Sequence, residues 1–404
     1  MTFAARKTVK KKLGNRKMRF IIVAYWHDRR FRTQVGGPIK VYELASNLER
    51  LGNEVVLIIP KIGYPERQTS AKVIAIPLVD YSVFRFISFQ FFAIFRILSL
   101  IIREGRPNIL YVRIMWSFLP MLLARLIRIP VILEVNDSPY RGYAFMKSRS
   151  KRRLIRFINR VSYHLSTHIL TVTEKIAEDL HHIDAVPRQT ISCFPSGANA
   201  ELFRPLDKIY CCEKLGFDFR KSYVGFIGTF FHYQGIHVLI DSARLIVQGY
   251  SNVRFLLVGD GPMRTNWEDM VTRLGLKRYF IFTGQVPYHF VPWYCGTMDI
   301  CVAPLLREAG ESSAVKLFEY LSCGKAVVMS DISNTGKEFL KSKAVILVQS
   351  ESSRELGEGI LKLLSDPIRR DKMGIKGRQF VLSKYDRLKL AQDLVELCEE
   401  TLRK

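Results

Sequence analysis

The sequence predicts an α/β protein built from two doubly wound domains, each organised around a parallel sheet. Each half begins with a short apolar run, residues 18–24 and 223–228, of the kind expected for a strand buried on both faces. In each half a glycine-containing loop and a helical pattern come before the next apolar run. This alternation of strand, loop and helix is typical of parallel sheets, which bind ligands at the carboxyl ends of their strands.

The individual elements follow this alternation. In the first half we expect a strand at 18–24, a Gly36-Gly37-Pro38 turn, a helix at 39–51 ended by Gly52, and strands at 55–59, 109–112, 131–135 and 169–172. In the second half we expect a helix from about 236 to 248, a final helix at 388–402, and strands at 223–228, 255–258, 280–283, 300–303, 326–329 and 345–348.

Positive charge is concentrated in the first half of the chain. The whole chain of 404 residues has a formal net charge of +25, and residues 1–205 hold 34 Lys and Arg against 14 Asp and Glu. Residues 141–160 contain eight basic and no acidic side chains, among them Arg149, Arg152, Arg153 and Arg156. Such a surface favours an anionic partner, and because no nucleic-acid-binding motif accompanies it, we expect a membrane rather than a nucleic acid.

Residues 82–102 form a strongly apolar segment that strengthens the membrane hypothesis. The segment is about as long as a membrane-spanning helix, but Arg85 and Arg96 interrupt it. Apolar and aromatic surface beside a basic cluster is typical of a protein that lies on an anionic bilayer. The alternative is that 82–102 is a core helix and 141–160 a solvated face.

The cysteines indicate the compartment. The seven cysteines are scattered and form no C-x-x-C pair, and no secretory signal precedes the first strand. Residues 1–17 carry seven basic and no acidic side chains and are expected to form a basic tail. A dispersed, odd set of cysteines is typical of a reduced protein, so we expect a cytoplasmic location.

The segment from Glu311 to Asp331 carries the clearest chemical pattern. Glu311 falls in a loop, and Glu319 lies eight residues later in an amphipathic helix that ends at Gly324. Backbone N–H groups at a helix start favour phosphate, and a carboxylate farther along the helix can accept both hydroxyls of a ribose. The candidate phosphate ligands between the two glutamates are the N–H groups of Ser313, Ala314 and Val315 and the ammonium of Lys316.

This segment, with its K-L-F-E-Y-L-x-x-G-K-x-V-V context, resembles the E-x7-E element of retaining nucleotide-sugar glycosyltransferases of the GT-B fold, especially family 4. The resemblance implies two Rossmann-like domains facing a central cleft. It implies that Glu319 binds the ribose and that Glu311 faces the donor sugar as a catalytic residue. No cofactor beyond the nucleotide-sugar co-substrate is implied, and no metal.

Two further segments resemble donor-binding elements of the same family. The loop Gly228-Thr-Phe-Phe-His-Tyr-Gln-Gly235 corresponds to G-R-L-x-x-x-K-G, with Thr229 and Gln234 in place of the two cations that neutralise the leaving diphosphate. Phe282-Thr-Gly-Gln-Val-Pro287 resembles F-x-G-x-V/I-P, whose backbone contacts the base, here at Val286. Backbone contacts of this kind favour a UDP-sugar over a GDP-sugar.

The first domain resembles the acceptor-binding half of the family. Gly36 and Gly37 correspond to glycines that let the backbone approach donor phosphate and acceptor, although a Gly-Gly-Pro turn needs no ligand. Asn136 and Asp137 follow the strand at 131–135, in the loop where many relatives carry a catalytic histidine.

The resulting hypothesis divides the chain into the tail 1–17, an acceptor-binding and membrane-facing domain 18–207, a nucleotide-sugar-binding domain 208–380, and a helix 381–404 that crosses back to the first domain. The expected activity is retaining transfer of a sugar from a nucleotide diphosphate to a hydroxyl of a lipid-linked or membrane-presented glycan, in polysaccharide or glycolipid biosynthesis. A non-catalytic subunit that binds nucleotide or a partner transferase, and a nucleotide-sugar epimerase, remain as alternatives.

Overall fold

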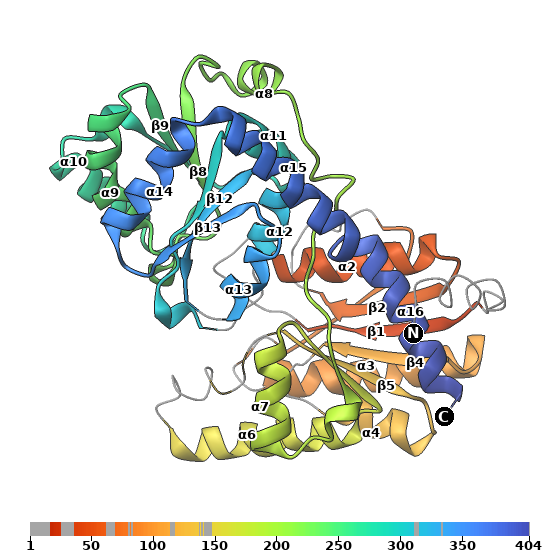
Figure 1. Ribbon diagram of the computed structural model, residues 1–404. Coiled ribbons are helices and arrows are strands. Elements are labelled where there is room, and N and C mark those ends of the chain that lie inside the picture. Colours follow the sequence, from red (N-terminus) through yellow and green to blue (C-terminus); the bar gives the residue numbers. More distant parts are fainter. Residues whose placement is uncertain are drawn as a thin grey trace.

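A computed structural model describes residues 17–25, 36–61, 69–79, 81, 84–113, 118–136, 138, 140, 148–310, 315–332 and 334–403. It contains two parallel sheets, one in each half of the chain, as the sequence predicts. Figure 1 shows the two domains one above the other, and the blue C-terminal part of the chain passes from the upper to the lower domain.

The N-terminal domain has a seven-stranded sheet in the order β3-β2-β1-β4-β5-β6-β7. All its strand pairs are parallel, and Arg19 aligns with Glu54 where β1 meets β2. Its strands are β1 (Arg19–Val23), β2 (Glu54–Pro60), β3 (Lys72–Ile76), β4 (Ile109–Arg113), β5 (Val131–Val135), β6 (His168–Thr171) and β7 (Ile191–Cys193).

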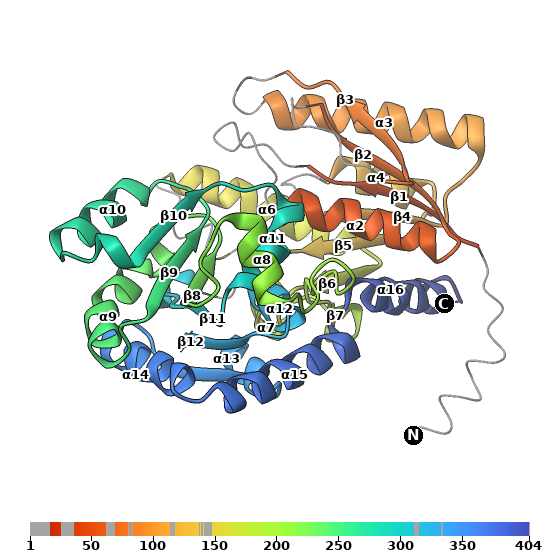
Figure 2. The same ribbon diagram turned by 90° about the horizontal axis from the view of Figure 1, so that it is seen from above.

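Helices cover both faces of this sheet. One face packs on α2 (Gly36–Arg50) and on the C-terminal helix α16 (Arg387–Arg403), through a core that includes Leu48 and Leu394. The other face is covered by α3 (Phe84–Glu104), α4 (Leu119–Leu126), α6 (Arg149–Leu165) and α7 (Glu174–Asp184). Figure 2 shows α3 and α16 on opposite sides of the N-terminal sheet.

The C-terminal domain has a six-stranded parallel sheet in the order β10-β9-β8-β11-β12-β13. Its strands are β8 (Ser222–Ile227), β9 (Val253–Val258), β10 (Phe280–Gly284), β11 (Ile300–Ala303), β12 (Ala326–Asp331) and β13 (Val345–Gln349). Its helices are α8 (Lys208–Leu215), α9 (Ile236–Gly249), α10 (Arg264–Arg273), α11 (Val291–Thr297), α12 (Val315–Ser322), α13 (Asn334–Leu340), α14 (Ser353–Leu364) and α15 (Pro367–Lys384).

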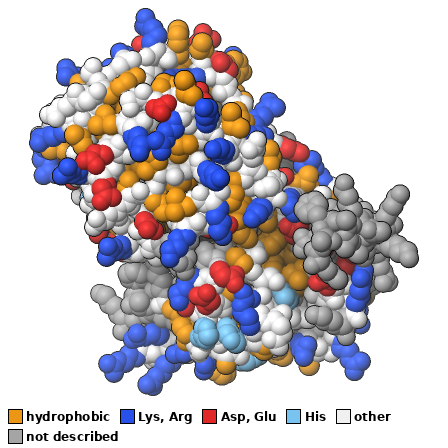
Figure 3. Space-filling model, viewed as in Figure 1, with side chains coloured by type: hydrophobic (Ala, Val, Ile, Leu, Met, Phe, Trp, Pro, Cys, Tyr) orange, Lys and Arg blue, Asp and Glu red, His pale blue; other side chains and the backbone are white. Residues whose placement is uncertain are grey.

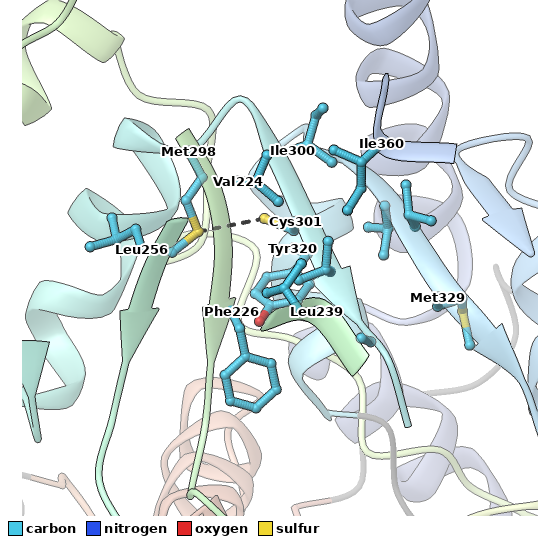
Figure 4. Packing of buried hydrophobic residues seen from close by; sticks show 14 of the residues in the cluster. Val224, Phe226, Leu239, Leu256, Met298, Ile300, Cys301, Tyr320, Met329 and Ile360 are labelled. Atoms are coloured by element: carbon cyan, nitrogen blue, oxygen red, sulfur yellow. Dashed lines mark hydrogen bonds between the residues drawn. The ribbon is translucent and has the colours of Figure 1, made fainter. Parts of the chain in front are cut away.

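The core of the C-terminal domain lies between this sheet and its helices. Figure 4 shows side chains of β8, β11 and α12 meeting there, with Tyr320 beside Phe226 and the Cys301 thiol 3.8 Å from the Met298 sulfur. The buried strand patterns explain why the short apolar runs of the sequence form the central strands.

Two expectations need adjustment. Gly36 and Gly37 are the first two residues of α2, which therefore starts earlier than the expected 39–51, and Pro38 in this first turn costs no helical hydrogen bond. The edge strands β3 and β7 were not anticipated, because one is only half buried and the other has three residues.

Candidate active site

The candidate donor site lies where the order of the C-terminal sheet reverses. β8 and β11 are neighbours in the sheet. After β8 the chain continues to β9 on one side of this pair, and after β11 it continues to β12 on the other side. In doubly wound sheets, ligands bind outside the carboxyl ends of the strands at this switch point. Gly228 and Thr229 directly follow β8 there, and Gly259, which follows β9, donates its N–H to Gly284 O at 3.0 Å.

Glu319 lies in the second turn of α12 and is largely buried, with 8% of its surface exposed. The Tyr288 hydroxyl donates a hydrogen bond to Glu319 Oε1 at 2.8 Å. Burial raises the pKa of Glu319 to about 7, although Arg387 and the bond from Tyr288 act in the opposite direction. A buried carboxylate with few donors is suited to accept the two hydroxyls of a ribose.

Lys316 lies one helical turn before Glu319, and its ammonium points to the loop after β8. Lys316 Nζ donates to the Gln234 side-chain oxygen and lies 4.1 Å from the centre of the Phe226 ring. Burial lowers the pKa of Lys316 to about 7, and Glu319 offsets part of this shift. A phosphate bound at this point would hold Lys316 in its charged form.

Gln234 thus has a structural role that the sequence did not indicate. At the position where the family form of the loop has a lysine, the amide oxygen of Gln234 accepts a hydrogen bond from Lys316. A lysine at this position would place a second ammonium against Lys316. The Lys316 ammonium also lies close to the backbone of the loop after β8, since a Cβ added to Gly228 would be 3.0 Å from Lys316 Nζ.

The remaining donor-side candidates sit around this point. Thr229 is half buried in the loop after β8, and Val286 follows β10 and packs partly against the domain core. Val315 is the first residue of α12. Glu311, Ser313 and Ala314 lie outside the described residues, as does Asp137 of the first domain.

In the first domain, Asn136 belongs to a buried polar cluster at the ends of β4 and β5. In the orientation that satisfies both neighbours, its amide donates to Glu134 Oε1 at 2.8 Å and accepts from Arg113 Nε at 2.7 Å. Glu134 also forms an ion pair with Lys40 of α2. With its side chain engaged on both sides, Asn136 is placed to orient Arg113 and Glu134.

The charges of this cluster stabilise one another. Burial alone would raise the pKa of Glu134, but Lys40 and Arg113 hold it below its usual value. Burial lowers the pKa of Lys40, and Glu134 counteracts part of that shift. Lys40 and Arg113 were not among the residues that the sequence singled out.

The structure also brings three unanticipated side chains to Glu319. Besides Tyr288, they are Arg387 at the start of α16 and Glu43 of α2, which form a buried ion pair with each other. Asn199 Nδ2 donates to Glu43 Oε1 at 3.2 Å. Asn199 lies in the segment that joins the two domains, between β7 and α8.

Two family models match the chain, one for each domain. The model described as glycosyl transferases group 1 matches residues 212–380, and the model described as glycosyltransferase family 4 matches residues 36–202. Together the two matches cover most of the chain.

Curated relatives are remote in sequence. An alpha-D-kanosaminyltransferase of Streptomyces kanamyceticus is 20% identical over 67% of this chain and 70% of its own length. A 2-deoxystreptamine N-acetyl-D-glucosaminyltransferase of Streptomyces fradiae is 27% identical over 56% of this chain. The chain spans only 55% of the length of that second relative.

Solved structures share the fold over the whole chain. A sucrose-phosphate synthase of Thermosynechococcus elongatus has a TM-score of 0.75 at 16% identity, covering 95% of this chain and 99% of that chain. WaaG, a glycosyltransferase involved in lipopolysaccharide biosynthesis, has a TM-score of 0.70 at 14% identity, covering 94% and 99%. These likenesses confirm the GT-B architecture. The family matches, one to each domain, show that the chain belongs to the group 1 glycosyltransferases.

Proposed function

We propose that this protein is a retaining glycosyltransferase that moves a sugar from a nucleoside diphosphate, UDP in preference to GDP, to a hydroxyl of a lipid-linked or membrane-presented glycan. The observation that carries the donor half of the proposal is the pairing of Lys316 and Glu319 on consecutive turns of α12. Their spacing suits the two ends of a nucleoside diphosphate, with diphosphate at the helix start and ribose one turn later.

The proposed reaction needs little covalent chemistry from the protein. The bond between the sugar C1 and the diphosphate oxygen breaks through an oxocarbenium-like state, and the bond from C1 to the acceptor oxygen forms on the same face. The departing phosphate takes the acceptor proton, so no separate base is required. Lys316 and the start of α12 stabilise the charge that develops on the diphosphate.

The preference for UDP is an inference from the segment at Val286. Contacts from the backbone at the end of β10 to the base would suit uracil, whose ring is smaller than that of guanine. Among structural neighbours, the Anabaena protein HepE has been solved with UDP and with UDP-glucose, whereas one curated relative from Corynebacterium glutamicum is named as GDP-mannose-dependent. Both nucleotides therefore belong in the test.

A donor-hydrolysis screen across UDP-, GDP- and ADP-sugars tests this proposal. We expect slow release of one nucleoside diphosphate by the wild type and its loss in Glu311→Gln and Lys316→Ala. Tight nucleotide binding without any turnover, with or without candidate acceptors, would instead favour the non-catalytic subunit. Interconversion of the donor sugar without release of nucleotide would favour the epimerase.

The proposal of a membrane-presented acceptor rests on the outer face of the N-terminal domain. We define the α3–α6 face as the exposed side of helices α3, α4 and α6; α4 contacts both α3 and α6. Its exposed apolar side chains are Phe84, Ile87, Phe91, Phe92, Phe95 and Ile102 on α3, Leu122 and Leu126 on α4, and Leu154 and Phe157 on α6.

α3 has the length and composition of a membrane-spanning helix, the one such helix in the described part of the chain. One side of it, including Phe89, Ala93 and Ile97, is buried against the sheet, whereas Phe95 on the other side is 64% exposed. A helix packed on a sheet in this way can lie on a bilayer but not cross it.

Basic side chains complete this face. Arg149 and Arg153 are exposed near the start of α6, beside Leu154 and Phe157. Figure 3 shows Lys and Arg side chains along the lower margin of the molecule, where Figure 1 places α6. Cationic charge beside exposed aromatic rings fits an anionic leaflet, and this is the basis for proposing a cytoplasmic enzyme held on the inner membrane surface.

A further inference from the structure

A buried set of polar side chains connects the proposed ribose carboxylate to the N-terminal domain. Arg387 lies at its centre: Nη1 forms an ion pair with Glu43 of α2 and is 3.5 Å from the Tyr288 hydroxyl oxygen. The Tyr288 hydroxyl in turn donates to Glu319. The Arg387 guanidinium is therefore connected to one carboxylate of each domain. It pairs directly with Glu43, and the Tyr288 hydroxyl links it to Glu319.

Hydrogen bonds hold one side of the Arg387 guanidinium, whereas a nitrogen on its other side can still donate to another acceptor. Arg387 is 5% exposed, its Nε donates to Ser196 O at 3.2 Å, and its backbone N–H donates to Ala198 O at 2.9 Å. Within the described part of the chain, however, buried Nη2 has no hydrogen-bond partner. A buried donor without a partner costs free energy. When the surrounding charges change, a movement of Arg387 that brings Nη2 to an acceptor would therefore recover this free energy.

At its N-terminal end, this connection reaches α2. Glu43 lies two turns into α2, the helix that begins with Gly36 and Gly37. Asn199 also donates to Glu43, from the segment that joins the domains. A shift of the Glu43 carboxylate is therefore transmitted to the helix whose first residues are the candidate acceptor and phosphate loop.

We propose that Arg387 is a positioning residue that couples binding of a nucleoside diphosphate at Glu319 to the placement of α2. This proposal rests on the proposed role of Glu319 as ribose ligand. Ribose hydroxyls that donate to Glu319 hold it as the anion and compete for the bond from Tyr288. Arg387 then shifts toward Glu319 and loosens its pairing with Glu43, so that α2 responds to the nucleotide.

Because such coupling is reciprocal, a change at Glu43 alters nucleotide affinity although Glu43 belongs to the other domain. The sign follows from the charges: Glu43 disfavours the Glu319 anion and Arg387 favours it. The charged and titratable side chains that act on Glu319 or feel its charge are Glu43 from α2, Tyr288 before α11, Cys295 from α11, Lys316 and Tyr320 from α12, and Arg387 from α16.

The first experiment measures UDP affinity by calorimetry at about pH 6, where Glu319, with a pKa of about 7, is mostly protonated in the free protein. We expect Glu43→Gln to bind UDP about fivefold more tightly than wild type, the lower end of typical coupling between linked sites. Arg387→Gln should bind UDP more weakly. A purely structural role for the ion pair predicts that both variants lose affinity, and that result would overturn the proposal.

The second experiment measures hydrogen exchange across residues 36–50 with and without saturating UDP. We expect UDP to change exchange in α2 of the wild type. We expect Arg387→Lys to bind UDP without this change, because one ammonium nitrogen cannot occupy the separate positions of Nε and Nη1, from which the guanidinium reaches Ser196 O, Glu43 and Tyr288. The matched control is Arg378→Lys. Arg378 also anchors the interdomain segment, donating to Phe203 O at 3.0 Å and Ala200 O at 3.3 Å, but it belongs to α15 and lies outside the connection described above.

The outcomes separate this inference from the proposed function. If wild type binds UDP and α2 exchange is unchanged, or if Arg387→Lys keeps the wild-type response, the coupling is refuted while the donor site stands. If wild type binds none of UDP, GDP and ADP, the proposed function fails and the coupling falls with it. Should Arg387→Gln not fold, the expected gain in affinity of Glu43→Gln still distinguishes the coupling from a purely structural role, which predicts a loss.

Discussion

Glu319 and Lys316 show how burial shifts the pKa of single residues in the candidate donor site. Burial moves the pKa of each group to about 7, upward for the carboxyl and downward for the ammonium. Near neutral pH, each group can therefore change its protonation state when a charged or hydrogen-bonding ligand binds beside it. Ribose hydroxyls bound at Glu319 would favour its anion, and a diphosphate bound at Lys316 would favour its cation.

The first prediction concerns the pH dependence of nucleotide affinity. Below about pH 7 Glu319 gains a proton and accepts fewer hydrogen bonds, and above about pH 7 Lys316 loses its charge. UDP affinity should therefore peak near neutral pH in calorimetric titrations from acid to alkaline buffer. Uridine has no phosphate that could ionise or contact Lys316, so its affinity should fall only on the acid side of this peak. An affinity for UDP that rises steadily through the alkaline range would contradict the role of Lys316.

The second prediction concerns Glu319 itself. Glu319→Ala should weaken nucleoside diphosphate binding by about 1.5–3 kcal/mol, the usual contribution of hydrogen bonds to a charged group. Glu213→Ala, an exposed glutamate on α8 of the same domain, is the control and should leave affinity unchanged. Equal affinity of Glu319→Ala and wild type in calorimetry would remove Glu319 from the site.

At the scale of elements, α12 links the candidate donor site to the core of its domain. Lys316 and Glu319 project from one part of the helix, while Tyr320 is buried against the end of β8. The Tyr320 hydroxyl accepts from Ile227 N at 2.6 Å and lies 3.3 Å from Ile227 O. The helix thereby fixes the point from which the Gly228 loop departs.

The third prediction tests this link. Tyr320→Phe leaves the Ile227 N–H without its partner and should lower the free energy of unfolding of the domain by about 1–3 kcal/mol, the cost of an unsatisfied buried donor. It should also weaken UDP binding, because the Gly228 loop loses its anchor. Tyr223→Phe is the matched control: Tyr223 is equally buried, and its hydroxyl donates to Asp218 O at 3.1 Å, near the opposite end of β8. Both variants should lose stability in urea titrations, and only Tyr320→Phe should lose affinity.

At the scale of the whole molecule, the α3–α6 face joins segments that are distant in the sequence. The apolar stretch at 84–102 and the basic stretch at 149–160 form two helices over one side of the N-terminal sheet, and α4 contacts both of them. The structure also refines the basic set. Arg156 lies 3.8 Å and Arg160 2.9 Å from the buried carboxylate of Asp184, so part of their charge is compensated within the domain.

The fourth prediction follows from this refinement. Replacing Arg149, Arg152 and Arg153 by Gln should weaken binding to anionic vesicles by about 3 kcal/mol, at about 1 kcal/mol for each basic residue near the surface. Salt should have a similar effect, because the attraction is screened beyond about 8 Å at physiological ionic strength. The control replaces Arg369, Lys372 and Lys376, which are exposed on α15 of the other domain. Co-sedimentation in low salt measures both, and a wild type that stays in the supernatant would rule out the membrane proposal.

The sequence alone determined the architecture and singled out the main candidate donor residues. Apolar runs of strand length set the central strands of both sheets, since a strand buried on both faces must be apolar throughout. The helical pattern around Glu319 placed this carboxylate and Lys316 on one helix, where spacing along the chain fixes their relation. The exposed face of α3 shows the limit of such reasoning, because its composition suited a core helix and a membrane-surface helix alike.

Only the tertiary structure decided which distant side chains meet at the site. Glu43 and Arg387 are 344 residues apart in sequence, and Tyr288 is 31 residues from Glu319. Local patterns specify which face of an element is buried, but not which polar group from another element reaches hydrogen-bonding distance. The same holds for Gln234 and Lys316, because Lys316 donates to the Gln234 side-chain oxygen at the loop position where the family form has a lysine. The pKa shifts were likewise decided there, because burial and neighbouring charges exist only once the domains have folded together.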